Sequence, residues 1–297
     1  MKQGTLAAFA AYLFWGVSPI YWKVLQSVPA FEILGHRIFW SFILLFLLIT
    51  VRKEWSSFQF ALKQPKIWLT FLLSASLLSI NWVVYIWAVN NGYIVDASLG
   101  YFINPLVNVL LGMFFLKERL RRGQFGAVLI AAVGVTYLAL SYGVVLWIAL
   151  TLASCFGFYG LLRKTAPLGS FQGLSLEIMF LILPALGYLL YLESMSAGTL
   201  TDTDPMTMFF LAFTGVITVI PLLLFTYGAQ RVTLTTLGIL QYVVPTLNFL
   251  IGVMLYGEAL TATRMIGFSI IWTALALYTV EGVLHARART TELPLGA

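Results

Sequence analysis

Residues 105–112 read PLVNVLLG, and residues 245–252, about 140 positions later, read PTLNFLIG. Proline, asparagine, leucine and glycine recur in register in these two stretches. An earlier pair lies at almost the same offset, because residues 14–17 read FWGV and residues 155–158 read CFGF. Each of the four stretches lies within a long apolar run. The chain therefore consists of two related halves.

The composition requires lipid as the solvent. Of the 297 residues, 61% are hydrophobic and 9% are charged, whereas a soluble domain is about 45–50% apolar and about 25% charged. A soluble fold of this size cannot hide so much apolar surface, so the sequence predicts an all-α integral membrane protein. The single cysteine, Cys155, excludes an intramolecular disulfide.

Ten apolar runs are long enough to cross a bilayer core, which takes about 20 residues per helix. They cover approximately residues 4–23, 30–51, 67–90, 95–116, 124–141, 144–162, 171–192, 206–228, 234–256 and 263–284. A short surface helix is expected around Trp55 and Phe58, in the gap between the second and third runs. The first repeat is placed at residues 1–142 and the second at residues 143–297. Because five helices per repeat is an odd number, the second repeat enters the membrane from the opposite side and is inverted.

The charges between the apolar runs predict the orientation. Lysine and arginine gather in alternate gaps, above all at residues 117–122, whereas the longest gap of the other set carries Glu193, Asp202 and Asp204. By the positive-inside rule, both termini face the cytoplasm. These gaps account for the net charge of +6, so no nucleic-acid partner is indicated. The first run lacks a cleavage site of small residues and is expected to remain as a span.

Two prolines, Pro105 and Pro245, lie near the middle of the fourth and ninth spans. Each removes one backbone N–H and leaves a carbonyl, that of Tyr101 or Gln241, without its usual helical partner. Lipid offers no hydrogen bond, so such a carbonyl must face protein, water or ligand. Either the prolines only kink their helices, or the matched breaks mark a substrate site. The asparagines that bracket the two breaks are Asn104, Asn108 and Asn248.

Further candidates for the wall of a central cavity lie in the first and third spans. Asn81 and Tyr85 are four residues apart and share a helix face. Trp15 lies near the middle of the first span, beside a glycine, and is expected to supply a stacking surface. Tyr21 and Trp22, at the end of the same span, are typical of the aromatic belt at a membrane interface.

Charged residues within the spans are rare and costly, and they indicate function. Arg37 lies about two turns into the second span, next to His36 and five residues after Glu32. Arg37 has three interpretations: a gating or structural pair with a carboxylate such as Glu32, a contact with a substrate carboxylate, or an orientation toward the interface. The first is favoured, and His36 is expected to be a packing residue. Glu177 is the deepest carboxylate.

Two further expectations concern carboxylates. Glu177 is expected to pair with a basic residue on the cytoplasmic side, such as Arg163, and Glu177→Gln is expected to retain substantial transport. Glu118 and Glu258 are repeat mates at the ends of their spans, where they are expected to close short turns and to favour the N-terminus of the next helix. The sequence contains no cluster with metal-ligand spacing and no phosphate-binding loop, so no metal, cofactor or ATPase activity is predicted.

These residues resemble those of a known family. The stretches that carry the likeness are residues 11–16 (AYLFWG), 32–37 (EILGHR), 81–82 (NW), 86–91 (IWAVNN), 97–108 (ASLGYFINPLVN), 221–223 (PLL), 236–238 (TLG) and 241–242 (QY). They are similar to the EamA-type members of the drug/metabolite transporter superfamily, and more narrowly to the RarD proteins of bacterial inner membranes. The resemblance covers nearly the whole chain. It implies the export of small metabolites or drugs, and for the RarD branch an association with chloramphenicol sensitivity.

The sequence and the resemblance together predict a monomeric secondary transporter of the bacterial inner membrane, working by alternating access through a central cavity. Its partners would be a small-molecule substrate, such as an amino-acid-like compound, and the lipid bilayer. Small four-helix relatives couple transport to protons through a glutamate in their first helix, but the first span here contains no acid. The alternative function is that of an integral membrane enzyme acting on a lipid or isoprenoid.

Overall fold

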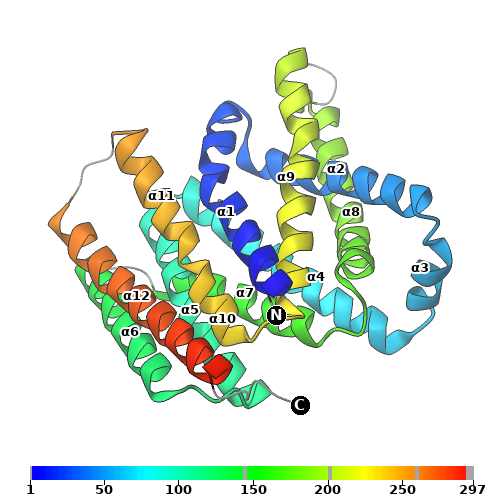
Figure 1. Cartoon of the computed structure of the whole chain (residues 1–297). Coiled ribbons are helices and arrows are strands. Elements are labelled where there is room, and N and C mark those ends of the chain that lie inside the picture. Colours follow the sequence, from blue (N-terminus) through cyan, green and yellow to red (C-terminus); the bar gives the residue numbers. More distant parts are fainter. Residues whose placement is uncertain (1, 143–145, 200–202, 258–260, 292–297) are drawn as a thin grey trace.

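The computed structural model describes residues 2–142, 146–199, 203–257 and 261–291. In these residues the chain forms twelve helices and no strand (Figure 1). The helices are α1 (Lys2–Val24), α2 (Ala30–Val51), α3 (Trp55–Leu62), α4 (Pro65–Asn90), α5 (Ile94–Leu116), α6 (Arg122–Tyr142), α7 (Leu146–Thr165), α8 (Ser170–Ser194), α9 (Pro205–Ala229), α10 (Leu234–Gln241), α11 (Val243–Met254) and α12 (Ala262–Thr291). Asp202 and Glu258 lie outside the described residues.

The described helices confirm an all-α protein built to cross a membrane. Nine stretches are long and apolar enough to span it: α1, α2, α4, α5, α6, α8, α9, α12, and the segment that comprises α10 and α11. The tenth expected span is α7, which packs against α4, α5 and α9 and carries Gly157 and Gly160. A helix surrounded by protein needs less apolar surface than one that faces lipid. The short helix expected around Trp55 is α3.

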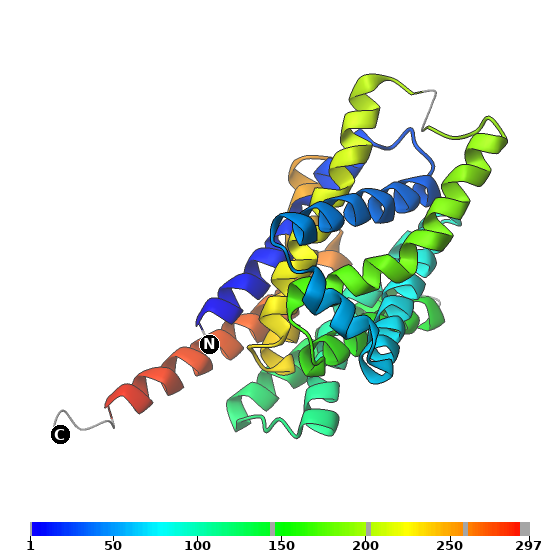
Figure 2. The same ribbon diagram turned by 90° about the vertical axis from the view of Figure 1, so that its right-hand side faces the viewer.

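The helices are arranged as one bundle with an elongated cross-section. Figure 1 shows α6 and α12 side by side at one edge, with α2, α8 and α9 toward the other edge and α3 outermost. The view in Figure 2, turned by 90°, places the start of α1 and the end of α12 on the same side of the bundle. The helices α1, α5, α7 and α10 lie between the two edges.

Most of the packing joins the first half of the chain to the second. Helix α1 packs against α9 and α11, α2 against α8 and α9, and α5 against α7 and α10. Two of these contacts correspond to each other, because Gly157 aligns with Gly16 and Leu247 aligns with Val107 in the sequence repeat. A Cβ on Gly16 of α1 would lie 2.5 Å from Leu247 Cδ1 of α11, and a Cβ on Gly157 of α7 would lie 2.7 Å from Val107 Cγ1 of α5.

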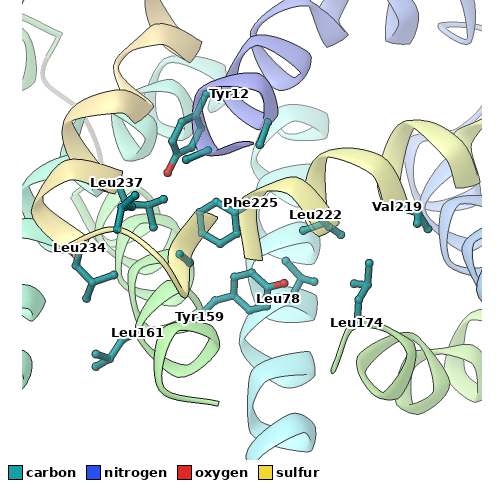
Figure 3. Close-up of a cluster of buried hydrophobic side chains, with 14 of the residues drawn as sticks. Tyr12, Leu78, Tyr159, Leu161, Leu174, Val219, Leu222, Phe225, Leu234 and Leu237 are labelled. Atoms are coloured by element: carbon teal, nitrogen blue, oxygen red, sulfur yellow. The ribbon is translucent and has the colours of Figure 1, made fainter. Parts of the chain in front are cut away.

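The largest group of buried apolar side chains lies where both halves meet (Figure 3). The rings of Tyr159 and Phe225 stack with their centroids 5.9 Å apart, and the ring of Tyr12 meets the edge of Phe225 at 6.1 Å. Tyr12, Tyr159 and Phe225 come from α1, α7 and α9, and all three are completely buried. The core therefore depends on helices from both halves.

Two helices in the second half begin with side-chain caps. Asp204 Oδ1 accepts hydrogen bonds from the backbone amides of Met206 and Thr207, both at 3.0 Å, at the start of α9. Hydrogen bonds from Thr207, and then from Met206, stabilise the charged form and lower the pKa of Asp204 below its usual value. Thr233 Oγ1 accepts from the Thr236 amide at 3.1 Å at the start of α10.

Candidate functional site

Three of the predicted site residues form one buried polar cluster between α5 and α10. Asn108 Nδ2 donates to Asn104 Oδ1 at 3.0 Å and to Gln241 Oε1 at 3.1 Å. Asn104 Nδ2 donates in turn to the Ala153 carbonyl of α7 at 2.7 Å. The three side chains are nearly inaccessible, with 2%, 1% and 4% exposure for Asn104, Asn108 and Gln241. Each side chain makes at least one hydrogen bond, which lowers the cost of burial, although Asn108 Oδ1 is buried and has no partner among the described residues.

Helix α5, which carries Pro105, packs directly against α10 beside this cluster, whereas Pro245 lies on the following helix, α11. Gly238 of α10 lies so close to α5 that a Cβ there would be 2.6 Å from the Pro105 carbonyl oxygen. Pro105 does not end its helix, because α5 continues from Ile94 to Leu116 and only one hydrogen bond is lost. The interruption in the ninth span lies at Tyr242, between α10 and α11, three residues before Pro245.

Asn81 and Asn248 lie apart from the cluster. Asn81 Nδ2 donates to the Leu152 carbonyl at 2.9 Å, so Asn81 and Asn104 bind consecutive carbonyls of α7. Asn248 Oδ1 is buried and has no hydrogen-bond partner among the described residues. Trp15 joins the aromatic core instead of a polar wall, with its ring 5.7 Å from Phe156 and 5.6 Å from Phe225.

Arg37 lies in an aromatic setting. Its guanidinium carbon is 4.9 Å from the ring centre of Trp22 on α1 and 4.7 Å from that of Trp82 on α4. Its Nε donates to Thr218 Oγ1 of α9 at 3.1 Å. Trp22, near the end of α1 and half-buried, therefore packs against a charged side chain in addition to the interface position expected for it. Tyr21 is also engaged within the bundle, since its hydroxyl donates to the Phe210 carbonyl.

The pair expected between Arg37 and Glu32 is absent from the described residues, because another segment occupies the carboxylate. Glu32 Oε1 accepts from the Thr199 amide at 2.6 Å and from Thr199 Oγ1 at 2.9 Å. Thr199 Oγ1 also lies 3.1 Å from His36 Nε2. Glu32 and His36 are both buried, so together they fix the end of the α8–α9 connection against α2.

The ion pair expected between Glu177 and Arg163 is present. Arg163 Nε lies 3.6 Å from Glu177 Oε1, and both side chains are fully inaccessible. Glu177 also accepts hydrogen bonds from Ser74 Oγ and from the hydroxyl of Tyr159, the latter at 3.3 Å. The guanidinium of Arg163 faces the ring of Phe71, with its carbon 5.0 Å from the ring centre. The pair joins α4, α7 and α8.

Glu118 does cap a helix, but not the one that follows it in sequence. Its carboxylate accepts from the amides of Leu234 at 2.7 Å and Thr235 at 3.0 Å, at the N-terminus of α10. Lys117 adopts a left-handed conformation with φ 55°, which ends α5 and precedes Glu118. The expectation that Glu118 favours the next helix, α6, is therefore wrong, because the repeat brings α10 closer to it.

Replacing Glu118 with alanine is expected to loosen the contact between α5 and α10. The variant would lose the acceptor of two backbone amides, and the loss of a capping group costs about 0.5–2 kcal/mol. We expect a lower melting temperature of the purified protein in detergent. Arg119→Ala, at an exposed neighbouring position, is the control and should melt like the wild type. Equal melting of both variants would contradict the capping role.

Two surface pockets lie at the periphery of the bundle. One lies beside α3 and is lined by Ser56, Phe60 and Gln172, among others. The second lies between α6 and α12, around Gly126 and Leu277. Neither is lined by a predicted site residue. Among the predicted residues, Asn104, Asn108 and Gln241 form the buried polar cluster, and Arg37 lies in a separate aromatic group.

The described helices form a polytopic membrane protein, and comparisons with known proteins identify the class as a membrane transporter. The EamA-like transporter family matches residues 2–140. An "Uncharacterized transporter" of Vibrio cholerae is 44% identical over 97% of this chain and 95% of its own length. "Protein RarD" of Escherichia coli K12 is 42% identical over 98% of both chains. This chain therefore belongs to the EamA-like transporter family.

A relative in a Gram-positive bacterium and a solved structure extend this assignment. "Uncharacterized transporter YojE" of Bacillus subtilis is 45% identical over 97% of both chains. A solved crystal structure with 21% sequence identity superposes with a TM-score of 0.72 and covers 93% of this chain and 97% of its own. At that identity the superposition supports the fold alone.

Proposed function

We propose that this protein is a secondary transporter that exports small organic molecules across the bacterial inner membrane by alternating access. The supporting observation is the polar cluster of Asn104, Asn108 and Gln241, which belongs to both halves at once. Inverted repeats place substrate sites at the interface between repeats, near the middle of the membrane. The cluster lies on α5, which carries the first copy of the repeated proline and asparagine, and on α10, which immediately precedes the second copy on α11.

The contacts between α5 and α10 would form the gate on one side of the site. They comprise the hydrogen bond between Asn108 and Gln241 and the cap of Glu118 on Leu234 and Thr235. A neutral hydrogen bond contributes about 0.5–1.5 kcal/mol and one to a charged group about 1.5–3 kcal/mol. The gate is thus held by a few kcal/mol, which differential binding of a substrate can shift. With cytoplasmic termini, this gate lies on the cytoplasmic side.

Gln241→Ala tests this function most directly. The variant removes the one side chain of α10 that bonds to Asn108, so transport should fall about threefold to tenfold, the equivalent of one neutral hydrogen bond. The measurement is the set of extracellular metabolites from cells that lack the gene, or that overexpress the wild type or the variant. Tyr101→Phe is the companion variant, because it keeps the ring and removes only the hydroxyl.

The outcome separates transport from the enzyme alternative. Overexpression of the wild type should raise a small set of metabolites outside the cell, and Gln241→Ala should lower that rise at an equal protein level in the membrane. An unchanged medium together with altered membrane lipids would refute transport and favour the enzyme. The names of the relatives agree with transport.

A further inference from the structure

Arg37 is a charge within the membrane whose position needs an explanation. It lies about two turns into α2, and the ion pairs among the described residues do not include it. Arg163, the other arginine inside the bundle, is paired with Glu177. An arginine at the centre of a membrane helix costs about 2.5–3.5 kcal/mol on insertion scales. Because Arg37 has no carboxylate partner among the described residues, its positive charge is available to an anionic ligand.

The hydrogen-bonding groups of Arg37 are only partly used. Nε donates to Thr218, and the two terminal nitrogens donate to no described residue. Neither terminal nitrogen is among the buried side-chain atoms without a partner, and Arg37 as a whole is only partly buried, so both nitrogens keep some accessible surface. The faces of the guanidinium are covered by Trp22 and Trp82. The edge with the terminal N–H groups is therefore the part of Arg37 that remains available.

Two tyrosines, Tyr85 and Tyr101, extend the aromatic group around Arg37. Tyr85 keeps 36% exposure although its ring centre lies 5.8 Å from that of Tyr101 on α5. Tyr85 follows Trp82, whose ring contacts Arg37, by three positions on α4, so the two side chains share a helix face. Arg37, Tyr85 and Tyr101 thus belong to one group of contacts that involves α2, α4 and α5. Neither tyrosine hydroxyl is among the buried polar atoms without a partner.

From this geometry we infer that Arg37 binds the carboxylate of the transported substrate, and that its aromatic neighbours hold an apolar or aromatic body. This inference rests on the proposed transport function and adds the substrate class, organic monocarboxylates. A guanidinium matches the two oxygens of a carboxylate with two parallel hydrogen bonds. The tryptophans hold the guanidinium in place by cation–π contact, so little freedom is lost on binding.

The charge at the site favours a carboxylate over a phosphate. Arg37 supplies one positive charge, and no second described cation contacts its surroundings; the amine of Lys23 lies instead 5.3 Å from the ring centre of Tyr256. A monocarboxylate is neutralised by one charge, whereas a phosphate dianion is not. Glu32, the acidic residue nearest in sequence, is held by Thr199 and leaves Arg37 free.

The test is a binding titration of the full-length protein in nanodiscs, read by the intrinsic fluorescence of the tryptophans. The probes are phenylacetate, its neutral analogue phenylacetamide, and phenyl phosphate. Wild type should bind phenylacetate saturably and more tightly than the other two. Arg37→Gln should weaken phenylacetate binding about tenfold to a hundredfold, as expected for a charge-assisted bidentate pair. Arg37→Lys should bind with intermediate affinity, because lysine keeps the positive charge but lacks the two parallel N–H donors of the guanidinium.

Arg231→Gln is the matched control, because Arg231 is an exposed arginine stacked 3.5 Å from the ring centre of Tyr227. It should bind phenylacetate like the wild type. A measurement without any variant guards against misfolding: phenylacetate, but not phenylacetamide, should protect Arg37 of the wild type from phenylglyoxal, as read by peptide mass spectrometry. Equal binding of phenylacetate and phenylacetamide, unchanged binding by Arg37→Gln, tighter binding of phenyl phosphate, or no saturable response would each overturn the inference.

A transport assay distinguishes this inference from the proposed function. Proteoliposomes that bind phenylacetate through Arg37 but do not carry it across the membrane would uphold the carboxylate site and refute transport. Vesicles in which Arg37→Gln carries phenylacetate as fast as the wild type would uphold transport and refute the site. Loss of carriage in Arg37→Gln with full carriage in Arg231→Gln would support both.

Discussion

Glu177→Gln is expected to remove most of the folded protein from the membrane. The substitution neutralises one member of a pair in which both side chains have 0% exposure, and leaves the charge of Arg163 without compensation. Breaking a buried pair in this way costs about 3–5 kcal/mol, a large part of a net stability of about 5–15 kcal/mol. The measurement is the amount of monodisperse protein recovered by size-exclusion chromatography of detergent extracts.

The double variant Arg163→Met/Glu177→Leu is the control for this effect. It removes both charges, and replacing a buried pair by apolar residues of similar volume is often neutral for stability. We expect protein recovery and transport close to those of the wild type. The sequence by itself predicts that Glu177→Gln retains substantial transport. Full recovery and full transport by this single variant would therefore contradict the structural role of the ion pair. Recovery of the double variant without transport would make Glu177 a candidate proton carrier.

Gly238→Ala is expected to abolish most of the transport. Its Cβ would lie 2.6 Å from the Pro105 carbonyl oxygen and 3.0 Å from Asn108 Cβ, so α5 and α10 must move apart. Overpacking of this kind costs about 1–3 kcal/mol, and here it also stretches the bond between Asn108 and Gln241. The measurement is transport in proteoliposomes with equal amounts of protein.

Gly126→Ala in α6 is the matched control for Gly238→Ala. A Cβ on Gly126 meets no atom within 4 Å, so the substitution adds helix propensity without a clash. It should keep full transport and melt at the same temperature as the wild type or higher. Normal transport by Gly238→Ala would show that the two helices do not need to touch at this point.

The apolar pattern alone locates the helices, but not their partners. The span predicted at residues 30–51 agrees with α2 (Ala30–Val51), and the surface helix around Trp55 was predictable from its position in a polar gap. These features depend on local composition, which the sequence shows directly. The break at Pro245 was likewise foreseen, although the helix is interrupted three residues earlier, at Tyr242.

The errors concern contacts between segments distant in sequence. Glu32 binds Thr199, 167 positions away, and Glu118 caps α10, 116 positions away. Both carboxylates therefore bind groups that are distant in sequence and not the neighbouring groups that were predicted. Trp22 and Thr218 were missed as neighbours of Arg37. An aromatic residue near a membrane arginine is a usable signal for a cation–π contact, whereas Thr218 carries no signal that the sequence alone reveals.

The packing of one half against the other has a consequence for biosynthesis. Helices α1, α2 and α5 find their main partners in residues after 145, so these partners do not yet exist when the first half enters the membrane. At about 5–20 residues per second, the ribosome needs roughly 8–30 s to complete the second half. During most of that interval the Asn108 side chain lacks its partner Gln241, whereas Ala153, the partner of Asn104, is made near the start. The nascent chain must therefore wait in lipid with its polar groups uncovered, which makes this interval the point at which membrane proteases and chaperones have most access to it.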